Sequence, residues 1–285
     1  MQIVNDLDLT PYNSYRLKST AKKAFFPETI DDLREIINTY DNLVILGGGN
    51  NTIFSKEYYE NENFVFIREN FSGISLINDT TMRALAGTDM KMLSEEALKH
   101  SLTGLEYFYD IPGCVGGGVV MNAGAKGEFL GDYLIEVECL DIRTGSQCKF
   151  SKDDLSYSYR NSIFQDKPCY IIISATFSLK KADYNAIKRK MEDNYIDRNR
   201  KQPRDFPNAG SVFKRPKGHF VGPMVTECGL KGYSIGGAMV STKHAGFIVN
   251  YNNATSKDIL NLIEKIRSEV SEKFGVELVV EQRII

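Results

Sequence analysis

Apolar residues recur at helical spacing in three stretches of the chain. In the first stretch, Leu33, Ile36 and Ile37 fall on one helical face. Thr29 stands at an N-cap position before them, and Asp32 follows three residues later. The same periodicity returns twice, so the pattern predicts helices over residues 29–40, 90–101 and 256–273.

Strands are predicted from short apolar runs and from alternation of apolar and polar positions. The run at 43–46 is apolar throughout and ends abruptly in glycines, which is typical of a buried strand. Residues 277–281 alternate only in part. The charged segment 182–200 is predicted to be a connecting helix. Together the patterns predict strands at 43–46, 64–67, 134–142, 170–179, 246–250 and 277–281.

The order of these elements indicates a mixed α+β protein with several modules. The chain has 285 residues, which is room for two or three modules because domains commonly run to ~100–200 residues. Hydrophobic residues make up 42% and charged residues 25%, as in an ordinary globular protein. We therefore expect a conventional buried core in each module.

Charge and hydropathy narrow the range of partners. The formal net charge is −2, which gives no overall attraction to nucleic acid or to an anionic membrane. No apolar run approaches the ~20 residues of a membrane helix, and the first residues lack the features of a signal peptide. We expect a cytoplasmic protein that binds small molecules, not nucleic acid or membrane. No exposed apolar helix face stands out, so we expect a monomer.

Cysteine and histidine positions argue against a metal site and against a disulfide framework. The five cysteines show no CxxC spacing, and the three histidines are scattered. No GxSxG serine elbow is present either. The sequence therefore predicts no metal and no serine-hydrolase chemistry.

Glycine-rich loops are the first candidate for ligand binding. Gly47–Gly49 follows the strand at 43–46, and a second loop covers Gly113–Gly118. Glycines let backbone N–H groups turn toward an anion, although one such loop is equally well explained as a tight turn. Neither loop fits a P-loop or a Rossmann fingerprint. We interpret the pair as a two-part cradle for the diphosphate of a dinucleotide.

Reactive side chains are found in the other half of the chain. Ser211 follows Gly210, Arg160 lies in a Tyr-Arg-Asn-Ser stretch, and Glu281 and Arg283 lie two positions apart. Each residue taken alone has a structural explanation that no single residue overturns, as a turn serine, a structural ion pair or a cross-strand pair. Together they supply a hydroxyl, a carboxylate and guanidiniums. This set suits protonation of a carbon next to a carboxylate-bearing group.

Several separated motifs occur in the order and spacing of one enzyme family. The motifs are Leu46-Gly47-Gly48-Gly49-Asn50-Asn51, Ile111 to Gly117 with Met121 to Gly124, Tyr159-Arg160-Asn161-Ser162, Gly210-Ser211-Val212-Phe213, His244-Ala245-Gly246-Phe247 and Glu281-Gln282-Arg283. With them the chain resembles the UDP-N-acetylenolpyruvoylglucosamine reductase (MurB) family over about residues 40–285. The short interval between Phe164 and the strand predicted at 170–179 resembles type II members, which lack a substrate-capping insertion.

The resemblance implies a fold, a cofactor and a reaction. The fold would be a two-module FAD-binding fold of the vanillyl-alcohol-oxidase (PCMH-like) type with a third α+β substrate-binding domain. FAD would bind without a covalent link, and NADPH would be the co-substrate for reduction of UDP-N-acetylglucosamine enolpyruvate to UDP-N-acetylmuramate. The implied division is 1–75 and 76–182 for the FAD-binding modules, 183–270 for the substrate-binding domain and 271–285 for the C-terminal segment with Glu281.

The resemblance also implies roles for individual residues. Ser211 would be the general acid, and Glu281 and Arg160 would polarise the substrate carboxylate and stabilise the developing charge. The substrate would further contact Tyr159, Arg198, Gln202, Arg215 and Arg283. FAD would contact Leu46, Gly47, Gly48, Gly49, Asn50, Asn51, Thr52, Gly87, Pro112, Gly113, Cys114, Gly116, Gly117, Asn122, Ala123 and Gly124.

The chain departs from the family pattern on the FAD side. The family usually has Ser at the position of Asn50 and Ser or Thr at that of Cys114, and residues 17–21 replace a usual Gly-Gly-Ala. Three alternatives to the reductase stay open. They are a divergent copy that reduces a related enolpyruvyl sugar, an FAD oxidase or dehydrogenase of the same fold, and a flavin- or UDP-sugar-binding protein without activity. No residue distinguishes NADPH from NADH.

Overall fold

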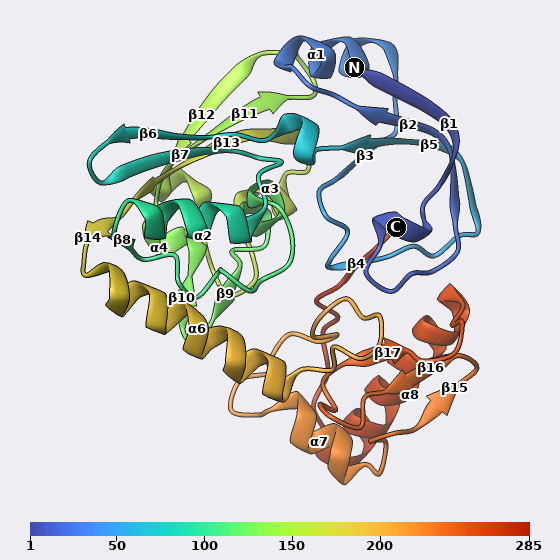
Figure 1. Cartoon of the computed structure of the whole chain (residues 1–285). Coiled ribbons are helices and arrows are strands. Elements are labelled where there is room, and N and C mark those ends of the chain that lie inside the picture. The colour runs from blue at the N-terminus through green and yellow to red at the C-terminus, as the bar shows by residue number, and fades with distance from the viewer. The chain divides into compact units, whose positions relative to one another are not determined.

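The computed structural model describes residues 1–285 (Figure 1). The chain forms two compact units from interleaved segments, each with its own buried apolar cluster. No helix has the length and apolar character needed to cross a membrane. Unit 1 comprises Met1–Asn5, Lys22–Gly48 and Asn61–Asp197, and unit 2 comprises Asp6–Ala21, Gly49–Glu60 and Arg198–Ile285.

The main sheet of unit 1 has five antiparallel strands in the order β12-β11-β13-β7-β6. Its central strand is β13, in which Ala175 lies opposite Val137 on one side and Ala84 on the other. Residues 171–175 are all buried, so both faces of the strand are covered. The strands are β6 Ile74–Asn78, β7 Thr81–Leu85, β11 Leu134–Asp141, β12 Gln147–Ser151 and β13 Tyr170–Ser178.

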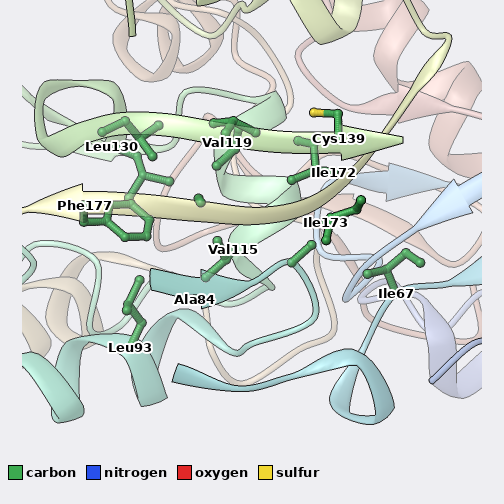
Figure 2. Packing of buried hydrophobic residues seen from close by; sticks show 14 of the residues in the cluster. Ile67, Ala84, Leu93, Val115, Val119, Leu130, Cys139, Ile172, Ile173 and Phe177 are labelled. Atoms are coloured by element: carbon green, nitrogen blue, oxygen red, sulfur yellow. The ribbon is translucent and has the colours of Figure 1, made fainter. Parts of the chain in front are cut away.

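Helices α2 (Met90–Lys99) and α3 (Val115–Val120) contribute apolar side chains to the core around this sheet. Figure 2 shows Leu93 of α2, Val119 of α3 and Phe177 of β13 within one cluster. Burying one such side chain contributes about 1.5–3 kcal/mol. This packing holds the start of α3, and with it the second glycine-rich loop.

A second sheet has the order β1-β2-β5-β3. Its strands β3 and β5 are parallel, with Val44 opposite Phe64 and Leu46 opposite Phe66. The end of β3 sets the position where the first glycine-rich loop begins. The strands are β1 Gln2–Asp8, β2 Thr20–Phe26, β3 Leu43–Leu46 and β5 Tyr58–Phe66, and the chain passes between the two units within β1, β2 and β5.

Helix α1 (Ile30–Thr39) begins with a capping box formed by Thr29 and Asp32, as predicted from the sequence. The N–H of Asp32 donates to Thr29 Oγ1 at 3.1 Å, and the N–H of Thr29 donates to Asp32 Oδ2 at 3.1 Å. These two bonds satisfy donors that a helix start leaves without intrahelical partners. The predicted apolar face is buried at Leu33 and Ile36.

Unit 2 packs helix α8 (Ser256–Phe274) against a small sheet, as Figure 1 shows. Thr255 and Asp258 form a capping box at its start, and Gly275 ends it in the left-handed conformation with φ 65°. The predicted apolar face is buried and forms the centre of the second core. The sheet has the order β15 Ser234–Ile235, β16 Ala238–Val240 and β17 Ile248–Asn250, with α7 Val221–Glu227 beside α8.

The remaining elements are short, apart from one long helix at the predicted position of the charged connector. That helix is α6, Tyr184–Lys201. The others are β4 Thr52–Ile53, β8 Leu102–Thr103, β9 Gly124–Ala125, β10 Glu128–Phe129, β14 Lys180–Lys181, β18 Arg283–Ile284, α4 Leu130–Tyr133, α5 Ile163–Asp166 and the 3-10 turns η1 Thr10–Tyr12, η2 Glu69–Phe71 and η3 Lys152–Leu155.

The strand predicted at 277–281 is wrong. This segment makes only a single bridge, between Val280 and Phe213, and the strand β18 begins later, at Arg283. The reason is a change of partner, because β18 pairs in parallel with β4. A run that pairs with two different segments in succession cannot build one continuous ladder.

Candidate active site

The two glycine-rich loops meet in unit 1. A Cβ atom added to Gly47, at the end of β3, would lie 3.4 Å from the Cβ of Cys114. Burial raises the pKa of the Cys114 thiol to about 11, so the thiol is neutral near pH 7. The sequence predicted that both loops serve one ligand, and the structure does bring Gly47 and Cys114 together.

Glycines in this region fall into two kinds. A Cβ on Gly87 would lie 1.9 Å from the carbonyl oxygen of Arg68, and a Cβ on Gly116 would lie 3.1 Å from the Cβ of Ala86. Packing requires glycine at position 87, and it leaves little room for a larger residue at position 116. Gly117, in contrast, is exposed and has no heavy atom within 4 Å of its Cβ position. Gly117 therefore leaves room beside the backbone that a ligand could fill.

The loop before α3 is fixed by backbone bonds to the start of α2. The N–H of Met90 donates to the carbonyl of Gly113 at 3.0 Å, and the N–H of Val115 donates to that of Thr88 at 2.8 Å. The side chain of Asp89 caps α2, and its backbone forms an isolated antiparallel β-bridge with that of Cys114. Asp89 is not among the residues predicted from the sequence, although an acidic residue directly before a helical periodicity is an N-cap signal.

Asn122 and Arg160 are joined through the loop at 122–124. Asn122 uses its own side chain inside the protein, donating to the carbonyl of Ser158 at 3.1 Å and accepting from the N–H of Gly131 at 3.1 Å. The guanidinium of Arg160 donates to the carbonyls of Asn122 at 3.3 Å and Gly124 at 2.9 Å. The loop therefore fixes where Arg160 lies.

A tight turn presents Tyr159 and Arg160. Ser158 and Asn161 exchange backbone hydrogen bonds of 3.2 Å in each direction, and Arg160 between them has a φ of 56°. The guanidinium lies 5.5 Å from the centre of the Tyr159 ring, and that ring is 46% exposed. The turn therefore brings an exposed aromatic ring and a cation together in unit 1.

The rest of the first glycine-rich loop belongs to unit 2. Gly49 has a φ of 65°, and a Cβ there would lie 2.0 Å from the carbonyl oxygen of Tyr12. The side chain of Asn50 donates to Ser14 Oγ at 2.8 Å. Asn51 donates to the carbonyl of Glu281 at 3.2 Å. Asn50 and Asn51 thus tie the loop to other parts of unit 2.

Ser211 and Glu281 lie on adjacent segments of unit 2. The N–H of Glu281 donates to the carbonyl of Val212 at 2.8 Å, and the N–H of Lys214 donates to that of Val279 at 2.8 Å. Ser211 is exposed, directly before this pairing. The structure therefore brings together the backbone segments that carry Ser211 and Glu281, which are far apart in sequence.

Residues that the sequence analysis left without a role support this segment. The side chain of Gln282 contacts the carbonyls of Ala209 and Gly210 and the hydroxyl of Tyr15. Within the His-Ala-Gly-Phe motif, the carbonyl of Gly246 accepts from the N–H of Val212 at 3.1 Å. No local pattern could reveal the Tyr15 contact, because the partners are 267 positions apart.

The other predicted substrate residues lie at several places in unit 2. Arg215 stacks on Phe220, with its guanidinium carbon 3.8 Å from the ring centre. The N–H of Gln202 donates to the carbonyl of Arg198 at the end of α6, at 2.8 Å. Arg283 begins β18 opposite Thr52 of β4.

The remaining predicted cofactor residues differ in their exposure. Leu46 is buried, Pro112 is exposed, Gly48 and Ala123 are half-buried, and Gly124 is in β9.

Comparison with known proteins first identifies the class. The FAD binding domain model matches residues 21–151, which include Gly47, Gly87 and the second glycine-rich loop. The chain is therefore an α+β protein of the FAD-binding class, and the predicted fold class and cofactor are confirmed.

The relatives identify the family within this class. The model described as "UDP-N-acetylenolpyruvoylglucosamine reductase, C-terminal domain" matches residues 202–285. A reductase of that name from Francisella tularensis is 42% identical over 280 residues, covering 98% of this chain and 99% of that protein. One from Caldanaerobacter subterraneus is 40% identical, covering 96% and 90%. The chain belongs to the UDP-N-acetylenolpyruvoylglucosamine reductase family, as the resemblance predicted.

A solved structure of the family supports the same assignment. The crystal structure of the UDP-N-acetylenolpyruvylglucosamine reductase (MurB) from Thermus caldophilus superposes with a TM-score of 0.80 at 28% identity. It covers 99% of this chain and 98% of that one. The similarity therefore extends over both units.

Proposed function

We propose that this chain reduces the enolpyruvyl group of UDP-N-acetylglucosamine enolpyruvate to give UDP-N-acetylmuramate, a precursor of peptidoglycan. NADPH is the reductant and FAD the non-covalent cofactor. Family membership supports the reaction, since the relatives carry the name of this reductase. The observation that carries the proposal is the pairing of the Ser211 segment with the segment of Glu281.

The glycine-rich loops fit a cofactor of this size. The first loop adjoins the second where Gly47 lies close to Cys114. Beside them, the open space at Gly117 leaves backbone that a ligand can reach. When bound, FAD supplies the transfer of hydride from NADPH to the alkene. Its proposed contacts are Leu46, Gly47, Gly48, Gly49, Asn50, Asn51, Thr52, Gly87, Pro112, Gly113, Cys114, Gly116, Gly117, Asn122, Ala123 and Gly124.

The reactive side chains belong to the chain itself. Ser211 donates the proton that completes reduction of the alkene, from an exposed hydroxyl. Glu281 and Arg160 polarise the substrate carboxylate and stabilise the charge that develops next to it. Such fixed groups act on the transition state more than on the bound substrate. Tyr159, Arg198, Gln202, Arg215 and Arg283 are the proposed substrate contacts.

The structure bears on the two departures nearest to the cofactor. Asn50 donates to Ser14, and Cys114 is a buried neutral thiol. Both side chains therefore serve to hold their loops, while backbone groups remain for the cofactor. We propose FAD-binding modules at 1–75 and 76–182, a substrate-binding domain at 183–270 and a C-terminal segment at 271–285, in a monomeric cytoplasmic protein of type II.

A spectroscopic titration tests this function. The purified protein, loaded with FAD, is mixed anaerobically with NADPH and then with UDP-N-acetylglucosamine enolpyruvate. We expect the flavin absorbance to bleach and then to return. Bleaching without recovery would indicate a different acceptor, such as a related enolpyruvyl sugar. Failure to bind FAD would contradict the proposal and favour a protein without activity.

A further inference from the structure

The side chain of Gln282 is buried and fully hydrogen-bonded. It is 4% exposed and lies directly after Glu281. Its Nε2 donates to the carbonyls of Ala209 at 3.0 Å and Gly210 at 3.3 Å, and its Oε1 accepts from the hydroxyl of Tyr15 at 3.0 Å. Buried amides with all polar atoms paired hold their surroundings in one arrangement.

Tyr15 fixes which way the amide points. Its side chain is fully buried, and burial raises its pKa, so the hydroxyl keeps its proton and remains a donor. A reversed Gln282 amide would place an oxygen against two carbonyl oxygens and would leave Tyr15 without an acceptor. The orientation that holds Ala209 and Gly210 is therefore the stable one.

Packing alone does not fix the residue before Ser211. Gly210 has a φ of 80°, and no heavy atom lies within 4 Å of its Cβ position. Its N–H donates to Asn208 Oδ1 at 3.1 Å, a contact two residues away within the same turn. The side chain of Gln282 supplies the hydrogen bonds that tie this turn to the segment of Glu281 on the side preceding Ser211.

On the other side of Ser211, the backbone provides the link. Val212 accepts from the N–H of Glu281 and donates to the carbonyl of Gly246. Glu281 therefore holds the residue after Ser211, and the next residue, Gln282, holds the two residues before it. Moving either contact would change where the Ser211 hydroxyl lies relative to Glu281.

We propose that Gln282, oriented by Tyr15, is a positioning residue that fixes Ser211 relative to Glu281 for proton delivery. The inference rests on the proposed function. In this step the proton leaves Ser211 Oγ and forms a C–H bond on the substrate carbon, and Ser211 regains a proton from solvent. A displacement of about 1 Å at such a donor can slow a reaction about 100-fold.

The test separates positioning from stability. Gln282→Met keeps the side-chain volume and removes the donors, while Tyr15→Phe removes only the hydroxyl. Thr255→Ala is the matched control, because it weakens the α8 cap in the same unit without touching Ser211. For each FAD-loaded variant, the rates of flavin reduction by NADPH and of reoxidation by the enolpyruvyl sugar are measured. Amide hydrogen exchange of residues 209–212 is measured on the same samples.

We expect Gln282→Met to slow reoxidation about 10- to 100-fold, to leave reduction within about 2-fold, and to speed exchange at 209–212. Tyr15→Phe should do the same to a smaller extent, and it decides the question if Gln282→Met does not fold. An unchanged rate of reoxidation would overturn the inference. Equal slowing of both half-reactions, which is the pattern of a general loss of stability that the control Thr255→Ala represents, would also overturn it.

The same samples distinguish failure of the inference from failure of the proposed function. If the wild-type protein is not reoxidised by the sugar, the proposed function is wrong. The exchange rates then still show whether Gln282 holds the Ser211 segment. Wild-type exchange in both variants would overturn the inference whatever the substrate.

Discussion

The glycine-rich loops of unit 1 and the Ser211 segment of unit 2 are held in different ways. In unit 1, the Cβ of Ala86 lies close to Gly116 of the second loop, and backbone atoms lie directly against Gly87 in the neighbouring turn before α2. In unit 2, Gly210 has open space around it, and side-chain hydrogen bonds from Gln282 and Asn208 hold its turn. The first region is shaped by close packing, and the second by a small number of polar contacts.

The difference indicates which changes each region tolerates. Close-packed backbone leaves no room for one added methyl group, since interiors are packed as tightly as organic crystals. The turn at Gly210 has open space at its Cβ position, although its φ of 80° still disfavours any side chain. Such a turn loses its position when a buried donor is removed. The close-packed positions on the cofactor side should therefore fail by losing their fold, and the catalytic side by losing one step of the reaction.

Gly87→Ala should give the largest effect. The new Cβ would stand 1.9 Å from the carbonyl oxygen of Arg68, a clash of the methyl group with backbone that no rotamer can relieve. We expect a loss of more than about 4 kcal/mol in the free energy of unfolding, measured by denaturant titration. A variant with wild-type stability would show that the loops of unit 1 are not packing-limited.

Gly117→Ala sharpens the same comparison with a smaller effect. This glycine is in α3 and has open space at its Cβ position, so alanine should leave the stability unchanged or raise it by up to about 1 kcal/mol. If FAD lies against this backbone, the methyl group should weaken FAD binding about 10-fold, equivalent to about 1.4 kcal/mol. Flavin fluorescence titration measures this. Unchanged affinity would remove Gly117 from the proposed cofactor contacts.

The pH dependence of unit 2 should give the smallest effect. Burial, with a further contribution from Lys231, lowers the pKa of His244 below its usual value of 6.5. The unfolded chain then binds the proton more readily, so stability is present above about pH 6.5 and is lost as the pH falls from there toward the folded pKa. Protonation would also oppose the N–H of Gly246, which donates to His244 Nδ1 at 3.1 Å.

Thermal unfolding between pH 7.5 and 5.5 measures this contribution. The wild-type melting temperature should fall over this range more than that of His244→Gln, which cannot titrate. Identical slopes for the two proteins would show that His244 does not couple protonation to the stability of unit 2.

Local signals in the sequence predicted the parts of the fold that depend on neighbouring residues. The capping residue Thr29 and the apolar periodicity of α8 each lie within a few positions of the structure that they specify. The two glycine-rich loops were likewise visible as compositional signals, and the structure confirms that they adjoin at Gly47 and Cys114.

Contacts between distant segments could not be predicted in the same way. Nothing local shows that Tyr15 contacts Gln282 or that the segment before β18 changes partner, which is why the strand at 277–281 was wrong. The sequence also could not show whether a single glycine is required by packing or leaves space for a ligand. Only the space around each one separates Gly87, required by packing, from Gly117, which is open.

The central claim is that the proton donor acts in one half-reaction only, and Ser211→Ala tests it most directly. The variant is loaded with FAD, and both half-reactions are followed by flavin absorbance. We predict reduction by NADPH at close to the wild-type rate and reoxidation by UDP-N-acetylglucosamine enolpyruvate slowed by about 10²- to 10⁴-fold, the usual contribution of a general acid. Equal loss in both half-reactions, or wild-type reoxidation, would contradict the account.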